Sequence, residues 1–433
     1  MKKISFNANS FLLSLFVLLF SQITSSKTVI HAGQLIDGNN PSPLQNMSIM
    51  ISGEKIISIE QGFIEPDIED IYIDLGSYTV LPGLIDMHVH LDGEHNKNSS
   101  NEKYILTEAD NAINSVVNAQ KTLLAGFTTV RNLGDSDLVT ISLRNAINKG
   151  IVPGPRIYTS GSTISSTGGH GDQSNGARKD LKKNLRKSNA VVNSPSDAFL
   201  AVRSRYQEGA DLIKITATGG VLSVAKNGEN PQFTKEELEA IISSSKDYGF
   251  KVAAHAHGAE GIKRAVIAGV NSIEHGTLMD EEGRKLMIQN GTYLVPTIMA
   301  GKWVEEKSKE ENYFPEIVRL KAAKIGPLIQ ASFGKAYQSG VKIAFGTDSG
   351  VSLHGENAKE FVLMVEAGMP PLQAILSATK EASILLGQDK LLGTLQEGKY
   401  ADIIAVSTNP IDDISSLQSI DFVMKAGEVY KTP

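Results

Sequence analysis

The stretch LPGLIDMHVH, residues Leu81–His90, ends an apolar run with two histidines one residue apart. In a β-strand, residues i and i+2 project from the same face. His88 and His90 therefore place two imidazoles side by side at a strand end, at a spacing that one metal ion can bridge. Imidazole is a common ligand of zinc and its neighbours. Alone, the pattern also fits two histidines on a solvated strand, so the rest of the chain has to decide.

The composition limits what such a site can be made of. The chain has 433 residues, a formal charge of −6 and no cysteine. This length suits a large barrel with a smaller second domain. The absence of cysteine excludes disulfides, thiolate metal sites and cysteine nucleophiles. The mild charge gives no indication of nucleic acid or of an anionic membrane surface as a partner.

The N-terminus has the layout of a secretory signal peptide. Lys2 and Lys3 precede the ten-residue apolar run Phe11–Phe20, and the small residues Thr24, Ser25 and Ser26 suit cleavage near Ser26. The run is short for a membrane span. We expect residues 1–26 to be removed and the mature protein, without a stable membrane anchor, to work in the periplasm or outside the cell. The alternative is an uncleaved anchor.

Both ends of the mature chain are rich in short strand patterns. Residues 27–80 and 391–433 alternate apolar and polar positions, interrupted by Gly and Asn. This pattern is typical of β-structure. Because a different pattern fills the middle, we expect one small β-sandwich domain built from both termini.

Residues 81–390 alternate strand and helix patterns, which predicts a TIM-like (β/α)8 barrel. A doubly wound open sheet is the alternative. Between the strands lie helical stretches, and Thr234 followed by Glu237 resembles a capping box. One stretch, 177–189, is basic and polar, and we expect a solvated loop or short helix there. The eight predicted strands are one ending near His88, then Phe127–Leu133, Arg156–Gly161, Leu212–Thr218, Lys251–His257, Asn271–Gly276, Thr292–Ile298 and Lys342–Asp348.

Residue types that bind metals recur at the predicted strand ends. In such barrels the active site is built at the C-terminal ends of the strands. Five of the nine histidines fall there. The recurring residues are His88, His90, Lys214, His255, His257, Glu274, His275 and Asp348. Their repeated placement favours one shared metal site over isolated structural histidines.

The chain resembles the amidohydrolase superfamily, in the branch with imidazolonepropionase-like enzymes, Xaa-Pro dipeptidases and carboxypeptidases. Within that branch it looks most like bacterial enzymes that remove a C-terminal residue from peptides, including those that hydrolyse the amide of ochratoxin A. The resemblance extends over nearly the whole mature chain. The motifs that carry it are LPGLIDMHVH, GFTTVRNLGD, STGGHGD, DLIKITATGG, VAAHAHG, NSIEHGT, AFGTDSG and GTLQEGKYADI.

The resemblance implies two divalent metal ions, with zinc as the default. His88, His90 and Asp348 would hold the first ion, and His255 and His275 the second. Lys214 would bridge them as a carbamate (N6-carboxylysine), because an ordinary lysine, with a pKa of about 10.4, is a cation and repels metal. Its neighbours Ile213 and Ile215 provide an apolar setting that disfavours a free ammonium. The alternative is a lysine that extends to the barrel rim.

The implied reaction is metal-assisted amide hydrolysis. Two ions that share a water would lower its pKa from about 15.7 toward about 7, so hydroxide is available to attack the amide at neutral pH. Asp348 would take the proton of this water and pass it to the departing amine. Other divalent ions, such as manganese or cobalt, suit the same ligands.

Further site residues are predicted with open alternatives. His170, between glycines, would donate a hydrogen bond to the scissile carbonyl or to a substrate carboxylate, unless it is structural. His257 would contact substrate or support the ligands; some relatives carry tyrosine there. Arg131 would bind a substrate carboxylate or form an internal salt bridge. His354 would line the pocket or be structural, and His31 and His95 are expected to be structural or solvated.

We therefore predict a secreted, binuclear amidohydrolase that cleaves a C-terminal amide in dipeptides, N-acyl amino acids or ochratoxin-like amides. Its partner would be a small molecule or peptide with a C-terminal carboxylate, and the resemblance implies a homo-oligomer. Cyclic amide or imidazolone ring opening is the alternative, although those pathways usually serve cytosolic catabolism. Two more remote hypotheses are a lactonase or phosphotriesterase-like activity and a barrel scaffold without metals or catalysis.

Overall fold

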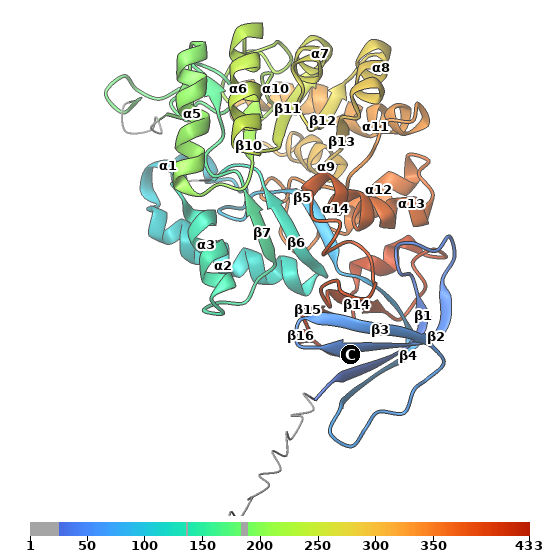
Figure 1. Ribbon diagram of the computed structural model, residues 1–433. Coiled ribbons are helices and arrows are strands. Elements are labelled where there is room, and N and C mark those ends of the chain that lie inside the picture. The colour runs from blue at the N-terminus through green and yellow to red at the C-terminus, as the bar shows by residue number, and fades with distance from the viewer. Residues whose placement is uncertain (1–25, 136, 183–188) are drawn as a thin grey trace, which may run out of the picture.

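The computed structural model describes residues 26–135, 137–182 and 189–433. An α/β barrel fills one end of the molecule, and a β-sheet built from both termini fills the other (Figure 1). The predicted signal peptide lies outside the described residues except for Ser26, and part of the basic stretch 177–189 does as well. Among the described residues, no helix combines the length and apolarity needed to cross a bilayer.

The terminal domain interleaves strands from the two ends of the chain. Its seven-stranded sheet has the order β16-β15-β14-β4-β1-β2-β3. β14 pairs antiparallel with β4, so C-terminal residues complete an N-terminal sheet. The sheet curls, so that the backbone N–H of Ile56 in edge strand β3 reaches the segment just before β14 and donates to the carbonyl of Lys399. The strands are β1 (Thr28–Leu35), β2 (Leu44–Ser52), β3 (Lys55–Gln61), β4 (Ile71–Pro82), β14 (Ile403–Val406), β15 (Phe422–Lys425) and β16 (Glu428–Lys431).

This arrangement confirms the predicted β-sandwich from both termini. Alternate apolar side chains of the strands enclose a core of their own, which includes Ile30, Ile49 and Ile403. The precise limits predicted for the two domains, 27–80 with 391–433 and 81–390, stay predictions.

Seven of the eight predicted barrel strands are regular and parallel. They form two ladders, β5-β6-β7 and β10-β11-β12-β13. Burial on both faces, as in β5 and β11, explains why their sequences read as apolar runs. The strands are β5 (Leu84–Val89), β6 (Phe127–Asn132), β7 (Arg156–Thr159), β10 (Ile213–Thr216), β11 (Val252–Gly258), β12 (Ser272–Leu278) and β13 (Tyr293–Val295).

The eighth predicted strand, 342–348, is irregular, which corrects the expectation of a full ladder there. It still closes the barrel between β13 and β5. Ala344 N donates to Leu294 O at 3.0 Å, and Met87 N donates to Phe345 O at 2.9 Å. On the opposite side, Ile164 joins β7 to β10, because its N–H donates to Lys214 O and its carbonyl accepts from Thr216 N. The barrel is therefore closed at these places by a few hydrogen bonds rather than by regular ladders.

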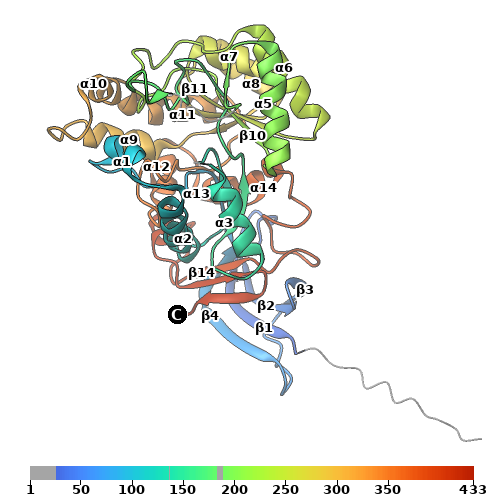
Figure 2. The same cartoon turned by 90° about the vertical axis from the view of Figure 1, so that its left-hand side faces the viewer.

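Helices cover the barrel, and α1, α9 and α10 lie together on one side of it (Figure 2). The predicted capping box of Thr234 and Glu237 is present at the start of α6. The helices are α1 (Ser99–Ile105), α2 (Glu108–Leu124), α3 (Val139–Asn148), α5 (Pro195–Glu208), α6 (Lys235–Asp247), α7 (Ala259–Ala268), α8 (Glu281–Asn290), α9 (Ile298–Lys307), α10 (Glu316–Ile325), α11 (Ile329–Gln338), α12 (Lys359–Glu366), α13 (Pro371–Ser377) and α14 (Lys380–Leu386). Two short strands, β8 (Ser165–Ser166) and β9 (Val191–Val192), and the 3-10 turns Gly326–Leu328 and Ile414–Gln418 complete the fold.

Candidate metal centre and active site

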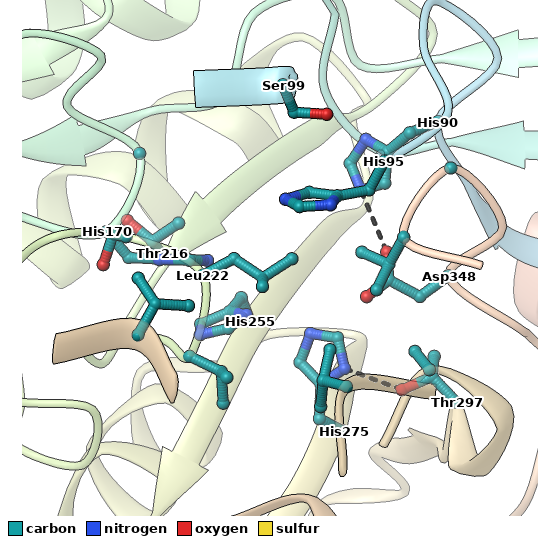
Figure 3. Close-up of a pocket in the computed structure, with 18 of the residues that line it drawn as sticks. His90, His95, Ser99, His170, Thr216, Leu222, His255, His275, Thr297 and Asp348 are labelled. Atoms are coloured by element: carbon teal, nitrogen blue, oxygen red, sulfur yellow. Dashed lines mark hydrogen bonds and ion pairs between the residues drawn. The ribbon is translucent and has the colours of Figure 1, made fainter. Parts of the chain in front are cut away.

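A cavity of about 550 Å³ opens at the carboxyl ends of the barrel strands. Its lining brings together side chains that lie far apart in the sequence (Figure 3). The predicted residues that line it are His88, His90, His170, Lys214, His255, His257, His275 and Asp348. All six predicted metal ligands therefore share one neighbourhood.

The first three ligands form a compact cluster. The Nε2 atoms of His88 and His90 lie 3.4 and 3.2 Å from Oδ1 of Asp348. The three ligand atoms of this set all fall within 4.8 Å of one another. Among the described residues, no hydrogen-bond donor satisfies Oδ1 of Asp348, although the atom is buried. A buried anionic oxygen that faces two imidazole nitrogens fits a cation at this point.

The remaining ligands adjoin this cluster. The ring centroids of His255 and His275 are 4.7 Å apart, and those of His88 and His275 are 5.1 Å apart. Lys214 Nζ lies 3.3 Å from His88 Nε2. Lys214 thus stands beside the first cluster on β10, whereas the two further histidines come from the next strands, β11 and β12.

Each of the four predicted imidazole ligands has one ring nitrogen held by a protein oxygen. Such a contact fixes the ring and leaves the other nitrogen for a metal, which is the usual arrangement of metal-binding histidines. The contacts are His88 Nδ1 to Glu274 Oε2 at 2.9 Å, His90 Nδ1 to Gly134 O at 3.4 Å, His255 Nε2 to Gly219 O at 3.1 Å and His275 Nδ1 to Thr297 Oγ1 at 2.7 Å. The side chains present therefore fit a metal site.

Three residues of the site adopt a backbone conformation that side chains disfavour. The φ angles are 71° at His275, 51° at Thr297 and 59° at Asp348. Left-handed backbone at such residues costs on the order of 1–3 kcal/mol each. Two of the three are predicted ligands, and the third holds His275 through its hydroxyl. The backbone strain is therefore found at residues whose side chains line the cavity.

Burial sets the protonation of the ligands. It lowers the pKa of His88 to about 4, so the imidazole is neutral at pH 7 and able to bind a cation. Burial would raise the pKa of Asp348, but His88 and His90 outweigh it and hold that pKa at about 2. Burial also lowers the pKa of Lys214 to about 8, opposed by Glu274 and Asp348. A partly neutral amine is the form that can react with carbon dioxide.

Arg131 does not face the cavity, which corrects its prediction as a substrate-binding residue. The side chain is 2% exposed and lies inside the barrel below the ligands. Its Nε donates to Met87 O at 2.7 Å, and its two terminal nitrogens donate to Ser272 Oγ and to Glu274 Oε1 at 3.1 and 2.8 Å. The internal salt bridge, which was the alternative, is therefore what the structure contains.

Glu274 is a site residue whose role the sequence did not reveal. Its carboxylate accepts from Arg131 and contacts His88 Nδ1, so it links the salt bridge to a ligand. Burial would raise its pKa, but Arg131 and His88 outweigh that effect and lower the pKa to about 2. The available signal was an acidic residue within the otherwise apolar start of β12, since a buried carboxylate requires partners.

Replacing Arg131 with methionine should lower the free energy of unfolding by about 3–5 kcal/mol, because Glu274 would keep a buried charge without its cation. Urea denaturation followed by circular dichroism measures the change. Arg178→Met is the control, because its ion pair with Asp180 is exposed and its loss should leave stability unchanged. A variant at Arg131 as stable as the unmodified protein would contradict the role given to this pair.

His170 and His257 occupy the wall beside the second pair of histidines. The ring of His170 stacks on His255 with centroids 4.4 Å apart, and its Nδ1 is buried with no hydrogen-bond partner among the described residues. The ring of His257 stacks on His275 and is held by Thr277 Oγ1 at 2.8 Å from its Nδ1. Both positions suit contact with substrate, and their catalytic and binding roles stay predictions.

The remaining histidines separate into three settings. His354 supports the loop after β5, since its Nε2 lies 3.2 and 3.0 Å from the carbonyls of His90 and Gly93. His31 lies in the terminal domain beside Tyr72. His95, expected to be structural or solvated, lines the cavity instead. It packs in an aromatic cluster with Trp303, Tyr313 and Phe314.

An apolar wall faces the ligands across the cavity. It is made by α9, α10 and the loop after β10, and no sequence pattern indicated it, because these segments meet only in the fold. The apolar residues that line the cavity from these elements and their connection are Val221, Leu222, Val224, Val304, Tyr313, Phe314, Val318 and Ile325. We call this set the apolar wall.

Comparison with known proteins places this geometry among hydrolases. Residues 79–432 match the model of the Amidohydrolase family. The ochratoxinase of Aspergillus niger is 33% identical over 432 residues, which cover 94% of this chain and 87% of that protein. The crystal structure of a Xaa-Pro dipeptidase with methionine bound in its active site is 55% identical, with a TM-score of 0.90 and coverage of 94% of this chain and 100% of that one.

Two further relatives show how far the sequence similarity extends within the family. A prolidase crystallised with N-methylphosphonate-L-proline is 30% identical, with a TM-score of 0.85 over 94% of this chain and all of its own. The imidazolonepropionase of Pseudomonas entomophila is more distant, at 25% identity over 87% of this chain and 90% of that protein. The relatives with dipeptidase, prolidase and ochratoxinase names are thus the more similar ones.

Proposed function

The chain belongs to the amidohydrolase family and is a metal-dependent hydrolase acting on C–N bonds; from this premise, we propose that it is a binuclear enzyme that cleaves the amide before a C-terminal residue. The observation that carries this proposal is the convergence of six ligand side chains in one cavity. His88, His90 and Asp348 would hold one ion. His255 and His275 would hold the other, with carbamylated Lys214 between them.

Bound divalent cations would supply polarisation of the scissile carbonyl and a hydroxide nucleophile at neutral pH. The side chains supply the proton transfers and the orientation. Asp348, ionised and facing the cavity, would accept the proton of the attacking water and donate it to the leaving amine. His170 would donate a hydrogen bond to the carbonyl oxygen or to the substrate carboxylate. Its Nδ1, which has no hydrogen-bond partner among the described residues, and its stacking on His255 support this role.

The shape of the cavity favours a substrate with an apolar residue next to the cleaved bond. The apolar wall offers side chains such as Val304 and Phe314 to that residue, and burial of each methylene there contributes about 0.8 kcal/mol. One solved relative holds methionine in its active site and another was crystallised with N-methylphosphonate-L-proline, and the side chains of methionine and proline are apolar and uncharged. We infer that dipeptides and N-acyl amino acids with an apolar C-terminal residue are the substrate class.

The test is a hydrolysis screen of metal-loaded protein against dipeptides and N-acyl amino acids that differ only in their C-terminal residue. Leucine, methionine and proline should be released faster than aspartate or lysine. Removal of metal with a chelator should abolish release, and added zinc, manganese or cobalt should restore it. Cleavage of a cyclic amide or imidazolone without any dipeptide cleavage would favour the alternative function. Purified protein that binds no metal and cleaves nothing would favour the scaffold.

We also propose that the enzyme is exported and acts as a homo-oligomer. Export rests on the basic and apolar layout of residues 1–26. The mature chain should begin near Lys27, which N-terminal sequencing of the exported protein would show. A chain that keeps Met1 and stays in the cytoplasm would exclude export, and a monomeric mass in solution would exclude the oligomer.

A further inference from the structure

The loop after β10, residues 217–232, joins the ligands to the apolar wall; we call it the pocket loop. Its base is pinned to the barrel. Gly219 O contacts His255 Nε2 at 3.1 Å, and the side chain of Gln232 accepts from His170 N at 2.8 Å. Gly219 N also donates to Asn230 O at 3.1 Å, which closes the base of the loop. The two ends of the pocket loop therefore touch two site histidines.

The middle of the pocket loop forms part of the cavity wall. Residues 221–224 all line the cavity (Figure 3 labels Leu222 beside His255). The backbone here has no strand or helix, and it packs closely on the site: a Cβ added to Gly220 would meet His170 Nδ1 at 2.4 Å. A shift in this segment would therefore change the shape of the cavity directly.

One buried ammonium holds this segment. Lys321, on α10, is 8% exposed, and its Nζ donates to Gly220 O at 2.8 Å, Ser223 O at 2.6 Å and Ala225 O at 2.9 Å. These contacts use all three donors of a lysine. Among the described residues, they are also all the hydrogen bonds accepted by the carbonyls of residues 220–226.

The helix that carries Lys321 is itself part of the wall. Val318 and Ile325 of α10 line the cavity and pack in one cluster with Val221. The ammonium and the apolar contacts therefore join the same two segments, α10 and the pocket loop. Because a buried cation that loses its acceptors is costly, the ammonium resists any separation of the two.

We propose that Lys321 is a positioning residue that fixes the pocket loop against α10 and thereby sets how tightly the cavity grips an apolar C-terminal residue. The proposal rests on the proposed function for its substrate, but the fixing of the loop does not. Lys321 does not line the cavity, so its effect passes through the backbone of residues 220–225. The residue thus acts on specificity and leaves the chemistry at the ligands to other side chains.

The variant Lys321→Met keeps the length of the side chain and removes its donors. For a dipeptide ending in leucine, kcat/KM should fall by about tenfold to a hundredfold, mostly through KM, as expected when hydrogen bonds to a charged group are lost. For the same dipeptide ending in alanine, which reaches the apolar wall less, kcat/KM should change by less than about threefold. Metal content should stay equal to that of the unmodified enzyme.

Lys324→Met is the matched control. Lys324 stands on the same helix and also contacts the pocket loop, through Glu229, but as a largely exposed ion pair. Its loss removes the same charge and should leave the leucine-to-alanine ratio unchanged. Lys321→Arg keeps the charge, but its planar fork cannot aim donors at three converging carbonyls, so its ratio should lie between those of the unmodified enzyme and Lys321→Met.

Amide hydrogen exchange of the unmodified protein tests the fixing of the loop without any variant or substrate. The backbone N–H groups of Gly219, Glu229 and Asn230, which donate hydrogen bonds at the base of the loop, should exchange slowly in the free enzyme, and in Lys321→Met they should exchange at least about tenfold faster. Rapid exchange in the unmodified protein would overturn the proposal even if Lys321→Met fails to fold. An equal loss on both dipeptides, or a lower melting temperature with an unchanged ratio, would overturn the specificity role. Failure of the unmodified enzyme to cleave either dipeptide would contradict the proposed function while the exchange result still decides the fixing of the loop.

Discussion

Replacing Lys214 with alanine should lower kcat/KM for amide hydrolysis by about a thousandfold or more, because the site loses the group proposed to join two cations and to balance their charge. Lys214 Nζ lies beside His88, and His255 and His275 come from the neighbouring strands. Without a bridging anion, His255 and His275 alone offer two neutral ligands, which is fewer than a stable divalent site requires. Metal analysis should therefore show about one ion per chain in place of two.

The controls for this variant separate the carbamate from a general effect of losing a lysine. Lys235→Ala, which removes an exposed lysine at the start of α6, should leave both metal content and activity unchanged. Added acetate or propionate should restore part of the activity of Lys214→Ala, since a small carboxylate can enter the space vacated by the side chain. A Lys214→Ala enzyme with two ions and full activity would exclude the carbamate role.

Replacing Asp348 with asparagine should lower kcat by about 10²–10⁴-fold, the range expected for a positioned acid–base group. The carboxylate faces His88 and His90 and keeps its charge down to a pKa of about 2. Asparagine has nearly the same shape but cannot accept the proton of the attacking water or return it to the amine. The fold should survive, because the backbone N–H of residue 348 still donates to His88 O.

Steady-state kinetics and circular dichroism together measure this prediction. Asp247→Asn, at the exposed end of α6, is the control and should behave like the unmodified enzyme. Turnover in Asp348→Asn equal to that of the unmodified enzyme would remove Asp348 as the proton carrier. A loss of turnover with a fully retained metal content would assign the effect to proton transfer rather than to metal binding.

The fold and the recurrence of metal-binding residue types at strand ends were accessible from local patterns in the sequence, and the assignment of six of them as ligands came from the family resemblance. Two histidines separated by one residue at the end of an apolar run, such as His88 and His90, lie on the same face of a strand, so their neighbourhood can be predicted from the sequence. Seven barrel strands were predicted correctly from continuous apolar runs. Such runs arise because strands of a parallel barrel are buried on both faces. The prediction of a regular strand at 342–348 was wrong, because this segment pairs with its neighbours only through isolated bridges such as that between Leu294 and Ile343.

The partners of the ligands were not accessible in the same way. Arg131 illustrates this for a predicted residue. Its position at a strand end was predicted correctly, but the sequence did not show whether its long side chain would point toward substrate or toward Glu274 inside the barrel. The contacts of Lys321 were even less predictable from the sequence, since its three acceptors lie about a hundred residues away in a loop without periodicity.

By itself, the sequence indicated a barrel with His, Lys and Asp at its strand ends, because side-chain type and strand period are local properties, and its resemblance to the amidohydrolase superfamily implied a hydrolase. Only the tertiary structure decided which of these groups meet, that Arg131 supports Glu274 rather than substrate, and that α9, α10 and the pocket loop enclose an apolar wall. The physical reason is that contacts between distant segments depend on how whole elements pack, and no short stretch of residues encodes that arrangement.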